Sequence, residues 1–218
     1  MRLANCFAAL VILALALSTA MAAQQRRTGD FDYYVLALSW SPSYCEAAGN
    51  RADPMQCQTD RPFAFVVHGL WPQYERGWPQ HCRLARPHKI TRQQTNSILD
   101  LMPSRGLIRH EWRKHGTCSG LTPTRYLDQV RQAWSKIVVP DQFQDVSSYV
   151  TARPDQILAA FIAVNPELKP NHVTLTCDSR RLREVRICMT RDLRFRRCTD
   201  RRNICRKNRI VLPPVRSR

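Results

Sequence analysis

Residues 110–118 concentrate groups that can transfer protons or carry charge within one short stretch of the chain. If the stretch is helical, successive residues advance by about 100° and residues three or four apart share a face. Glu111 then lies beside Lys114 and His115, and His110 also lies beside Lys114. We therefore expect imidazole, carboxylate and ammonium groups to meet on one side of a helix.

A second run, residues 65–72, supplies a third imidazole. His68 follows the apolar residues 63–67, which are predicted to form a strand, and Gly69 and Pro72 come just after it, where we expect the backbone to turn. Imidazole serves as acid or base near neutral pH because its unperturbed pKa is about 6.5. With a cation to offset negative charge, such a set suits cleavage of RNA by its own 2′-hydroxyl.

Zinc hydrolysis is the competing interpretation of residues 110–118. The H-E-x-x-H motif places two histidines four residues apart, whereas His110 and His115 are five apart, or about 140° around a helix. A zinc enzyme would be sensitive to chelators, and the sequence predicts indifference to them. We interpret the other histidines of the mature chain as structural, namely His81, His88 and His172.

The chain begins with features of an export signal. Residues 1–22 carry Arg2, an apolar core at residues 7–17 and small residues before an expected cleavage site near Ala22 or Ala23. The core is too short for a membrane span, and no other stretch approaches membrane length. Residues 23–218 are thus predicted to form one soluble domain without a membrane anchor. Loss of Cys6 with the signal leaves eight cysteines, an even number typical of disulfides in an exported chain rather than of metal ligands.

The charge balance is strongly basic. The formal net charge is +17, from 34 Lys and Arg against 17 Asp and Glu. Residues 178–218 hold fifteen Arg and Lys against four acidic residues, so the charge gathers at the C-terminal end. A polyanion is the expected partner, although a basic face that aids only solubility or surface adhesion explains charge alone equally well. We hypothesise that this end extends the track that binds the polyanion, through Arg194, Arg196, Arg197, Arg201 and Arg202.

Sequence patterns predict strands at both ends of the chain and helices between them. The expected strands are residues 33–40, 63–67, 172–177, 182–189 and 209–212, and the expected helices are residues 91–102, 107–115, 122–138 and one beginning at Pro154. Residues 44–62 are predicted to be a loop closed by a local disulfide, and residues 71–88 an irregular surface excursion. This order favours a single α+β domain with a largely antiparallel central sheet flanked by helices and stapled by disulfides.

Four segments resemble the ribonuclease T2 family. Residues 65–72, FVVHGLWP, are similar to its first active-site segment, and residues 110–118, HEWRKHGTC, to its second. Residues 38–45, LSWSPSYC, and 77–82, GWPQHC, resemble neighbouring family segments. The resemblance spans most of the chain between Asp32 and Cys205.

The resemblance implies a role for each residue of the two motifs. His115 would be the general base on the 2′-hydroxyl, and His68 the general acid to the departing 5′-oxygen. His110 would contact phosphate, while Glu111 and Lys114 would stabilise the pentacoordinate phosphorus. The implied reaction yields 2′,3′-cyclic phosphate ends from single-stranded RNA and then, more slowly, 3′-phosphates, with no metal or cofactor. DNA lacks the nucleophile and should not be cut.

Base recognition is implied with less detail. Trp71 and Trp78 resemble aromatic residues that stack on the base 5′ to the cleaved bond, and Gln73 occupies a position that often carries an acidic or amide residue. Ordinary packing is the alternative for both tryptophans. Many members have Gln in the N-terminal strand where this chain has Ser39, so we expect low base specificity.

The resemblance further implies a complete pairing of the cysteines, namely Cys45–Cys57, Cys82–Cys118, Cys177–Cys205 and Cys188–Cys198. We expect a monomer without an obligate protein partner, exported to the periplasm or outside the cell. The alternative function is a catalytically inactive basic RNA-binding or surface-interaction module on the same fold.

Overall fold

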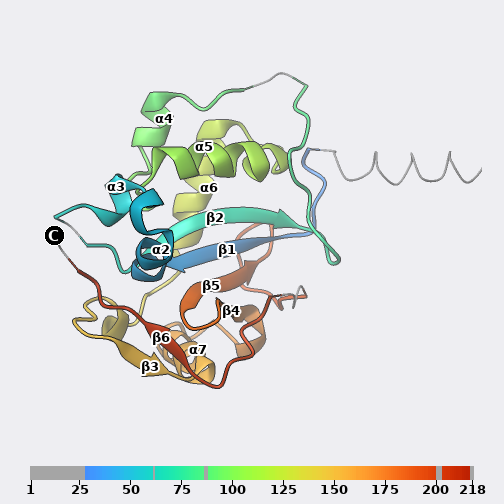
Figure 1. The fold of residues 1–218 in the computed structure, drawn as a ribbon. Helices are drawn as coiled ribbons and strands as arrows, with labels where there is room; N and C mark the ends of the chain where they lie inside the picture. The colour runs from blue at the N-terminus through green and yellow to red at the C-terminus, as the bar shows by residue number, and fades with distance from the viewer. Residues whose placement is uncertain (1–27, 61, 86–87, 200–202, 217–218) are drawn as a thin grey trace, which may run out of the picture.

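A four-stranded antiparallel sheet forms the centre of the molecule, with the strand order β2-β1-β5-β4 (Figure 1). The computed structural model describes residues 28–60, 62–85, 88–199 and 203–216. The predicted export signal, together with Arg201 and Arg202, lies outside these residues. The strands are β1 (Tyr33–Trp40), β2 (Phe65–Gln73), β4 (Val173–Cys177) and β5 (Leu182–Met189).

The two faces of this sheet differ in how they are packed, as the residues of β1 show. Tyr34, Leu36, Leu38 and Trp40 alternate along the strand and belong to the main hydrophobic core. The opposite face carries the side chains of Tyr33, Val35, Ala37 and Ser39 because successive residues of a strand point to opposite sides. The last two of these are small. The sheet therefore has a filled core face and a shallower second face.

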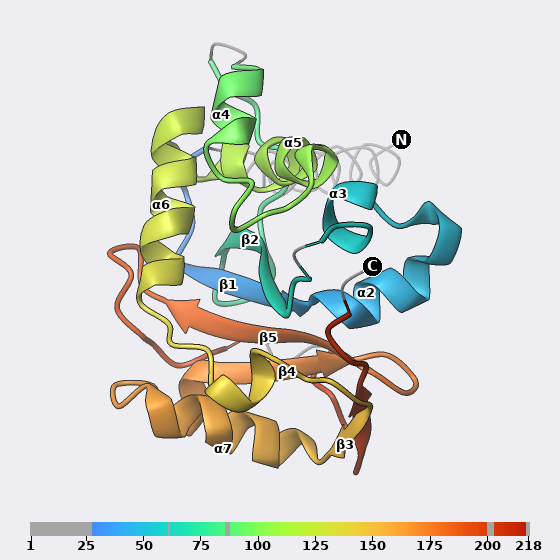
Figure 2. The same cartoon turned by 90° about the vertical axis from the view of Figure 1, so that its left-hand side faces the viewer.

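Helices close the core face and one edge of the sheet. Helix α6 packs against β1 and β2, α7 packs against β4, and α5 lies beside the edge strand β2 (Figure 2). The two core helices begin with proline, which suits the first helical turn because its missing N–H needs no partner there. The helices are α2 (Ser41–Ala48), α3 (Pro54–Cys57), α4 (Arg92–Asn96), α5 (Arg105–Lys114), α6 (Pro123–Ser135) and α7 (Pro154–Val164).

A second, smaller sheet pairs β3 (Val150–Ala152) with β6 (Ile210–Leu212) in antiparallel register. Four disulfides staple the fold, and they are the same pairs that the resemblance implies: Cys45–Cys57, Cys82–Cys118, Cys177–Cys205 and Cys188–Cys198. Among the described residues, no helix has both the length and the apolar character needed to cross a membrane. The predicted α+β class with an antiparallel central sheet is confirmed.

Three local predictions were wrong. The predicted loop at residues 44–62 instead contains most of α2 and all of α3, where Asp53 caps α3 by accepting a hydrogen bond from the Met55 N–H at 2.9 Å. Strand β2 does not end at His68 but continues to Gln73, because β1 pairs with it along its whole length. Helix α4 ends at Asn96 rather than near residue 102, and the chain continues there in turns.

Candidate active site

All eight residues that the sequence predicts for catalysis or substrate binding line one cleft of about 280 Å³. The cleft lies on the second face of the sheet, between strands β2 and β5 and helix α5. Its lining also includes three residues that the sequence motifs did not indicate. The full lining is His68, Trp71, Gln73, Trp78, His110, Glu111, Lys114, His115, Glu184, Arg186 and Asn203.

A β-bulge places His68 at the cleft. Ala37 of β1 pairs with Gly69, whereas the next residue, Leu38, pairs with Val67, so His68 is the extra residue of β2. A bulge breaks the strict alternation of side chains and re-aims the residue that it contains. His68 and Trp71 can thus both face the cleft although they are three residues apart, a spacing that puts side chains on opposite faces of a regular strand.

Helix α5 brings the second motif to the same cleft. Ser104 caps its N-terminus by accepting a hydrogen bond from the Leu107 N–H at 3.1 Å. The helix ends at Lys114, and His115 is its C-cap residue. Glu111 and His115 are buried, with exposed fractions of 2% and 5%, because they lie between the helix and the sheet. The helical arrangement predicted for this motif is confirmed, except that His115 lies just past the last helical residue.

Gly69 allows β2 and α5 to approach closely. A Cβ atom at this position would collide with Oε2 of Glu111 and with Nε1 of Trp71. In the space that the glycine leaves, Trp71 Nε1 donates a hydrogen bond to Glu111 Oε2 at 2.6 Å. The other oxygen, Oε1, lies 3.6 Å from Nε2 of His68. Glu111 thereby connects the helix to both functional side chains of β2.

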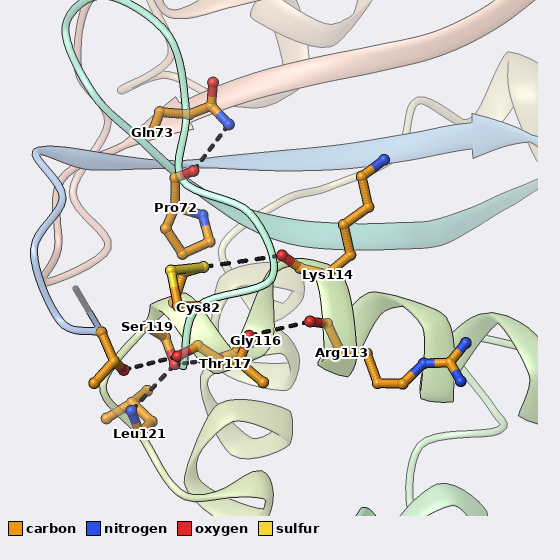
Figure 3. Close-up of a disulfide and its surroundings, with 11 residues drawn as sticks. Pro72, Gln73, Cys82, Arg113, Lys114, Gly116, Thr117, Ser119 and Leu121 are labelled. Atoms are coloured by element: carbon orange, nitrogen blue, oxygen red, sulfur yellow. Dashed lines mark hydrogen bonds between the residues drawn. A yellow bond between two sulfur atoms is a disulfide. The ribbon is translucent and has the colours of Figure 1, made fainter. Parts of the chain in front are cut away.

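The disulfide between Cys82 and Cys118 fixes the C-terminal end of α5 against the segment that follows β2 (Figure 3). The His81 N–H donates to the Lys114 carbonyl at 2.8 Å, which adds a backbone contact beside the disulfide. Figure 3 also shows the side chain of Lys114 directed toward the strands and that of Arg113 directed away. The covalent link therefore holds the two motif-bearing segments together at the point where His115 emerges.

His115 is held in its neutral form. Burial lowers its pKa to about 3, and the positive charges of Lys114, His68 and His110 act in the same direction. The ring lies 5.3 Å from the Trp71 ring, at an interplanar angle of 31°. Its Nδ1 has no hydrogen-bond partner among the described residues. A neutral, buried imidazole at a cleft can accept a proton, which is what a general base must do.

The surroundings of His68 shift its pKa in the opposite direction. Burial disfavours its charge, but the hydrogen bond and the negative charge of Glu184, with the charge of Glu111, outweigh burial and raise the pKa of His68. Nδ1 of His68 lies 2.5 Å from Oε1 of Glu184. A protonated imidazole can donate a proton, and two titratable groups whose pKa values are pushed apart are typical of an acid and base pair.

Sequence reasoning missed Glu184, Arg186 and Asn203 as cleft residues. The first two lie in the strand predicted at residues 182–189, which β5 confirms, and their side chains share one of its faces. Only the strand order shows that this face lies across β1 from His68 and Trp71. Asn203 has a positive φ of 60°, which marks a local turn rather than a site.

A second pocket of about 220 Å³ lies on the other side of His68. His68 and Glu184 line both the cleft and this pocket. Ser39 forms part of its wall, as a small side chain in β1. The remaining lining residues are Trp40, Tyr44, Gln56, Val66, Ser104, Leu107 and Arg183. Within the described chain, no three His, Cys, Asp or Glu side chains are placed to hold a metal ion.

The fold and the cleft together define a disulfide-stapled α+β protein with an imidazole pair as its candidate acid and base. Comparison with known proteins assigns the family: the model of the ribonuclease T2 family matches residues 31–198, and the chain belongs to this family. Ribonuclease of Aeromonas hydrophila is 53% identical over 94 residues, which cover 43% of this chain and 40% of that protein. Ribonuclease I of Escherichia coli (strain K12) is 29% identical over 156 residues, which cover 54% of this chain and 58% of that protein.

Solved structures share the fold. An RNase-related protein from Calystegia sepium aligns with a TM-score of 0.67 at 21% identity, over 86% of this chain and 99% of its own. RNase NT, solved in complex with 5′-AMP, aligns with a TM-score of 0.65 at 23% identity, over 85% of this chain and 99% of its own. The aligned segments span only about half of the curated relatives named above, so the comparisons establish the family and the fold.

Proposed function

We propose that the protein is an endoribonuclease that cleaves single-stranded RNA without a metal ion or cofactor. The observation that carries the proposal is the pair of imidazoles at one cleft, with the pKa of His115 lowered and that of His68 raised. Such a pair is ready for acid–base catalysis near neutral pH. Membership of the ribonuclease T2 family supports the same reaction class.

In the proposed first step, His115 takes the proton of the 2′-hydroxyl while the 2′-oxygen forms a bond to phosphorus. The bond between phosphorus and the 5′-oxygen breaks, and His68 gives its proton to that oxygen. The product is a 2′,3′-cyclic phosphate and a free 5′-hydroxyl. Lys114 and Glu111 stabilise the pentacoordinate phosphorus, the ammonium group by offsetting negative charge, and His110 contacts the phosphate; all three line the cleft. In the slower second step water opens the cyclic phosphate, with the two imidazoles in exchanged roles.

The two hollows on either side of His68 suit the two nucleosides that flank the cleaved bond. The leaving nucleoside carries the 5′-oxygen that His68 protonates, so we assign its base to the pocket lined by Ser39. The base 5′ to the bond then lies in the main cleft near Trp78, which exposes 39% of its surface. Trp71 already contacts His115 and Arg186, which limits its role in stacking. Stacking on an aromatic ring tolerates any base, which supports low base specificity.

Four disulfides support export to an oxidising compartment, the periplasm or the exterior. We keep the expectation of a monomer. The extended RNA track at the C-terminal end has weaker support. Arg194 is paired with Asp192, and Arg196 with Glu75, each at 2.7 Å, so part of that positive charge is compensated.

The test is digestion of a defined single-stranded RNA in EDTA by the wild-type protein and by His115→Ala. The proposal predicts cleavage that the variant loses by about 10²- to 10⁴-fold, the usual contribution of a general base. The alternative, an inactive RNA-binding module, predicts RNA binding without cleavage by either protein. A zinc hydrolase predicts cleavage that EDTA abolishes.

A further inference from the structure

Glu184 is a buried carboxylate that the acid and base roles above do not use. Only 7% of its surface is exposed, and it lies on β5, one of the two inner strands of the sheet. An ionised carboxylate is costly to bury unless partners satisfy both of its oxygens. Here two of the partners, His68 and Arg186, line the cleft.

The contacts of Glu184 are specific on each oxygen. Oε1 lies 2.5 Å from Nδ1 of His68. Oε2 accepts a hydrogen bond from Arg186 Nε at 2.8 Å, lies 2.7 Å from Arg186 Nη2 in an ion pair, and lies 3.4 Å from Thr176 Oγ1. Because Arg186 and Thr176 both hold Oε2, the other oxygen is directed at His68. The orientation of Glu184 is therefore set by β5 itself and by the adjacent strand β4.

The sheet makes this contact possible across an intervening strand. Glu184 pairs with Ser39 of β1, and Arg186 pairs with Ala37, so these side chains share the second face of the sheet. Because Ser39 and Ala37 are small, Glu184 and Arg186 can reach over β1 toward β2. The bulge at His68 brings the imidazole to meet them.

We propose that Glu184 is a positioning residue for the general acid: it accepts the Nδ1 proton of His68 in a hydrogen bond and so directs the Nε2 proton toward the departing 5′-oxygen. Arg186 holds the Glu184 carboxylate in this orientation. The Cζ atom of Arg186 also lies 5.1 Å from the centroid of the Trp71 ring, in a cation–π contact. This inference rests on the endoribonuclease function proposed above, and it adds a role for β5, which neither active-site segment contains.

The charges around His68 fit this arrangement. Glu184 and Glu111 favour the protonated imidazole, and Arg186 opposes it. Burial would raise the pKa of Glu184, but the hydrogen bond and charge of His68, together with Arg186, lower it to about 2. Glu184 therefore stays ionised throughout the working range. The other titratable groups that line the cleft with His68 are His110, Lys114 and His115.

The experiment compares two substrates that share the uridine 3′-phosphate and differ in their leaving group. A dinucleoside phosphate such as UpA has a 5′-alkoxide leaving group that must be protonated. Uridine 3′-(4-nitrophenyl phosphate) has a leaving group that departs as a stable anion. We expect Glu184→Gln to lower kcat/KM by at least about 10-fold on UpA, within the roughly 10²- to 10⁴-fold contribution of the acid itself. On the aryl ester the loss should stay below about 3-fold.

The pH profile provides a readout that a merely structural role would not change. Since the Glu184 charge raises the pKa of His68, its removal should move the basic limb of kcat/KM on UpA to lower pH. Glu184→Asp keeps a carboxylate near Arg186, but its shorter side chain moves that carboxylate away from Nδ1 of His68. This variant should show the same substrate dependence even if Glu184→Gln folds poorly. Asp100→Asn is the matched control, because Asp100 forms a two-point contact with Arg131 on the surface, away from the cleft.

Equal losses on both substrates with an unmoved basic limb would overturn the inference. Failure of the proposed function looks different: the wild-type protein would then cleave neither substrate. His68→Ala supplies the reference pattern, with a large loss on UpA and a small one on the aryl ester. His115→Ala should impair both substrates, because both require removal of the 2′-hydroxyl proton.

Discussion

Removal of the disulfide between Cys82 and Cys118 should reduce both stability and catalysis. The two cysteines are 36 residues apart, so the crosslink closes a long loop in the unfolded chain. The loop-entropy relation gives a stabilisation of about 4 kcal/mol at 25 °C. For a domain of this size that loss corresponds to a decrease in Tm of roughly 8 to 16 °C.

The same disulfide also positions the end of α5, so activity should fall beyond what unfolding explains. Misplacement of a reacting group by about 1 Å can cost about 10²-fold in rate. We expect the Cys82→Ala/Cys118→Ala double variant to lose about 10- to 100-fold in kcat/KM at a temperature where it is fully folded. Urea unfolding and calorimetry measure the stability, and initial rates on UpA measure the activity.

The control is the Cys45→Ala/Cys57→Ala double variant. That disulfide spans 12 residues and links α2 to α3, beside Tyr44 and Gln56 of the second pocket, so its loss should cost about 3 kcal/mol. On uridine 3′-(4-nitrophenyl phosphate), which has no leaving nucleoside to fill that pocket, kcat/KM of the folded control should be unchanged, whereas loss of Cys82–Cys118 should lower it. If the Cys82→Ala/Cys118→Ala variant keeps the wild-type kcat/KM, the disulfide does not position the site. If it keeps the wild-type stability, the entropic reasoning fails.

Three further predictions concern the cleft. Gly69→Ala should destabilise the fold by about 1 to 3 kcal/mol and lower activity, because Glu111 and Trp71 must move to make room for the new Cβ. The control is Gly106→Ala in α5, where the new Cβ would lie 3.6 Å from the nearest atom outside its helix and neighbours. This control should change neither the stability in urea unfolding nor the rate. The acid limb of kcat/KM against pH should lie well below pH 6.5, since His115 stays neutral down to its lowered pKa, and the basic limb above pH 6.5, since the pKa of His68 is raised. An acid limb at or above pH 6.5, or a basic limb below it, would contradict these shifts. Trp78→Ala should remove a stacking contact and raise KM on dinucleotides by the equivalent of about 1 to 3 kcal/mol, with little change in kcat. The control is Tyr149→Ala, at another exposed aromatic residue, which should leave steady-state kinetics unchanged.

The sequence predicted much of the cleft because six of its residues lie in two short motifs with strong local patterns, residues 65–72 and 110–118. The helical spacing of Glu111, Lys114 and His115 depends only on the local geometry of α5, so the structure agrees with it apart from the C-cap position of His115. The strand from Tyr33 to Trp40 was predicted with its correct limits because it is apolar on both faces, as expected for an inner strand.

Features that depend on strand pairing could not be predicted. The bulge at His68 exists only as a register shift relative to β1, which no local pattern encodes. Glu184 is adjacent to His68 only because β5 follows β1 in the sheet, although 116 residues separate them in the chain. The short strand β3 is stabilised by its pairing with β6, so its three residues carry little signal of their own.

Helices α2 and α3 were missed for a different reason. Ser41-Pro42 directly follows the strand predicted at residues 33–40, and proline there suits the first turn of a helix. Asp53-Pro54 repeats that signature, with a capping carboxylate before the proline. The many polar residues and the two cysteines of this segment favoured a loop over these start signals. The disulfide between Cys45 and Cys57 in fact joins the two short helices.

The most direct test of the central claim uses a DNA oligonucleotide that contains a single ribonucleotide, incubated with the protein in EDTA. The two-imidazole mechanism requires the 2′-hydroxyl as nucleophile, so it predicts cleavage only at the phosphate 3′ to that ribonucleotide. Mass spectrometry should find a 2′,3′-cyclic phosphate on one fragment and a 5′-hydroxyl on the other. Cleavage at deoxynucleotides, or fragments that end in a 3′-hydroxyl and a 5′-phosphate, would contradict the mechanism.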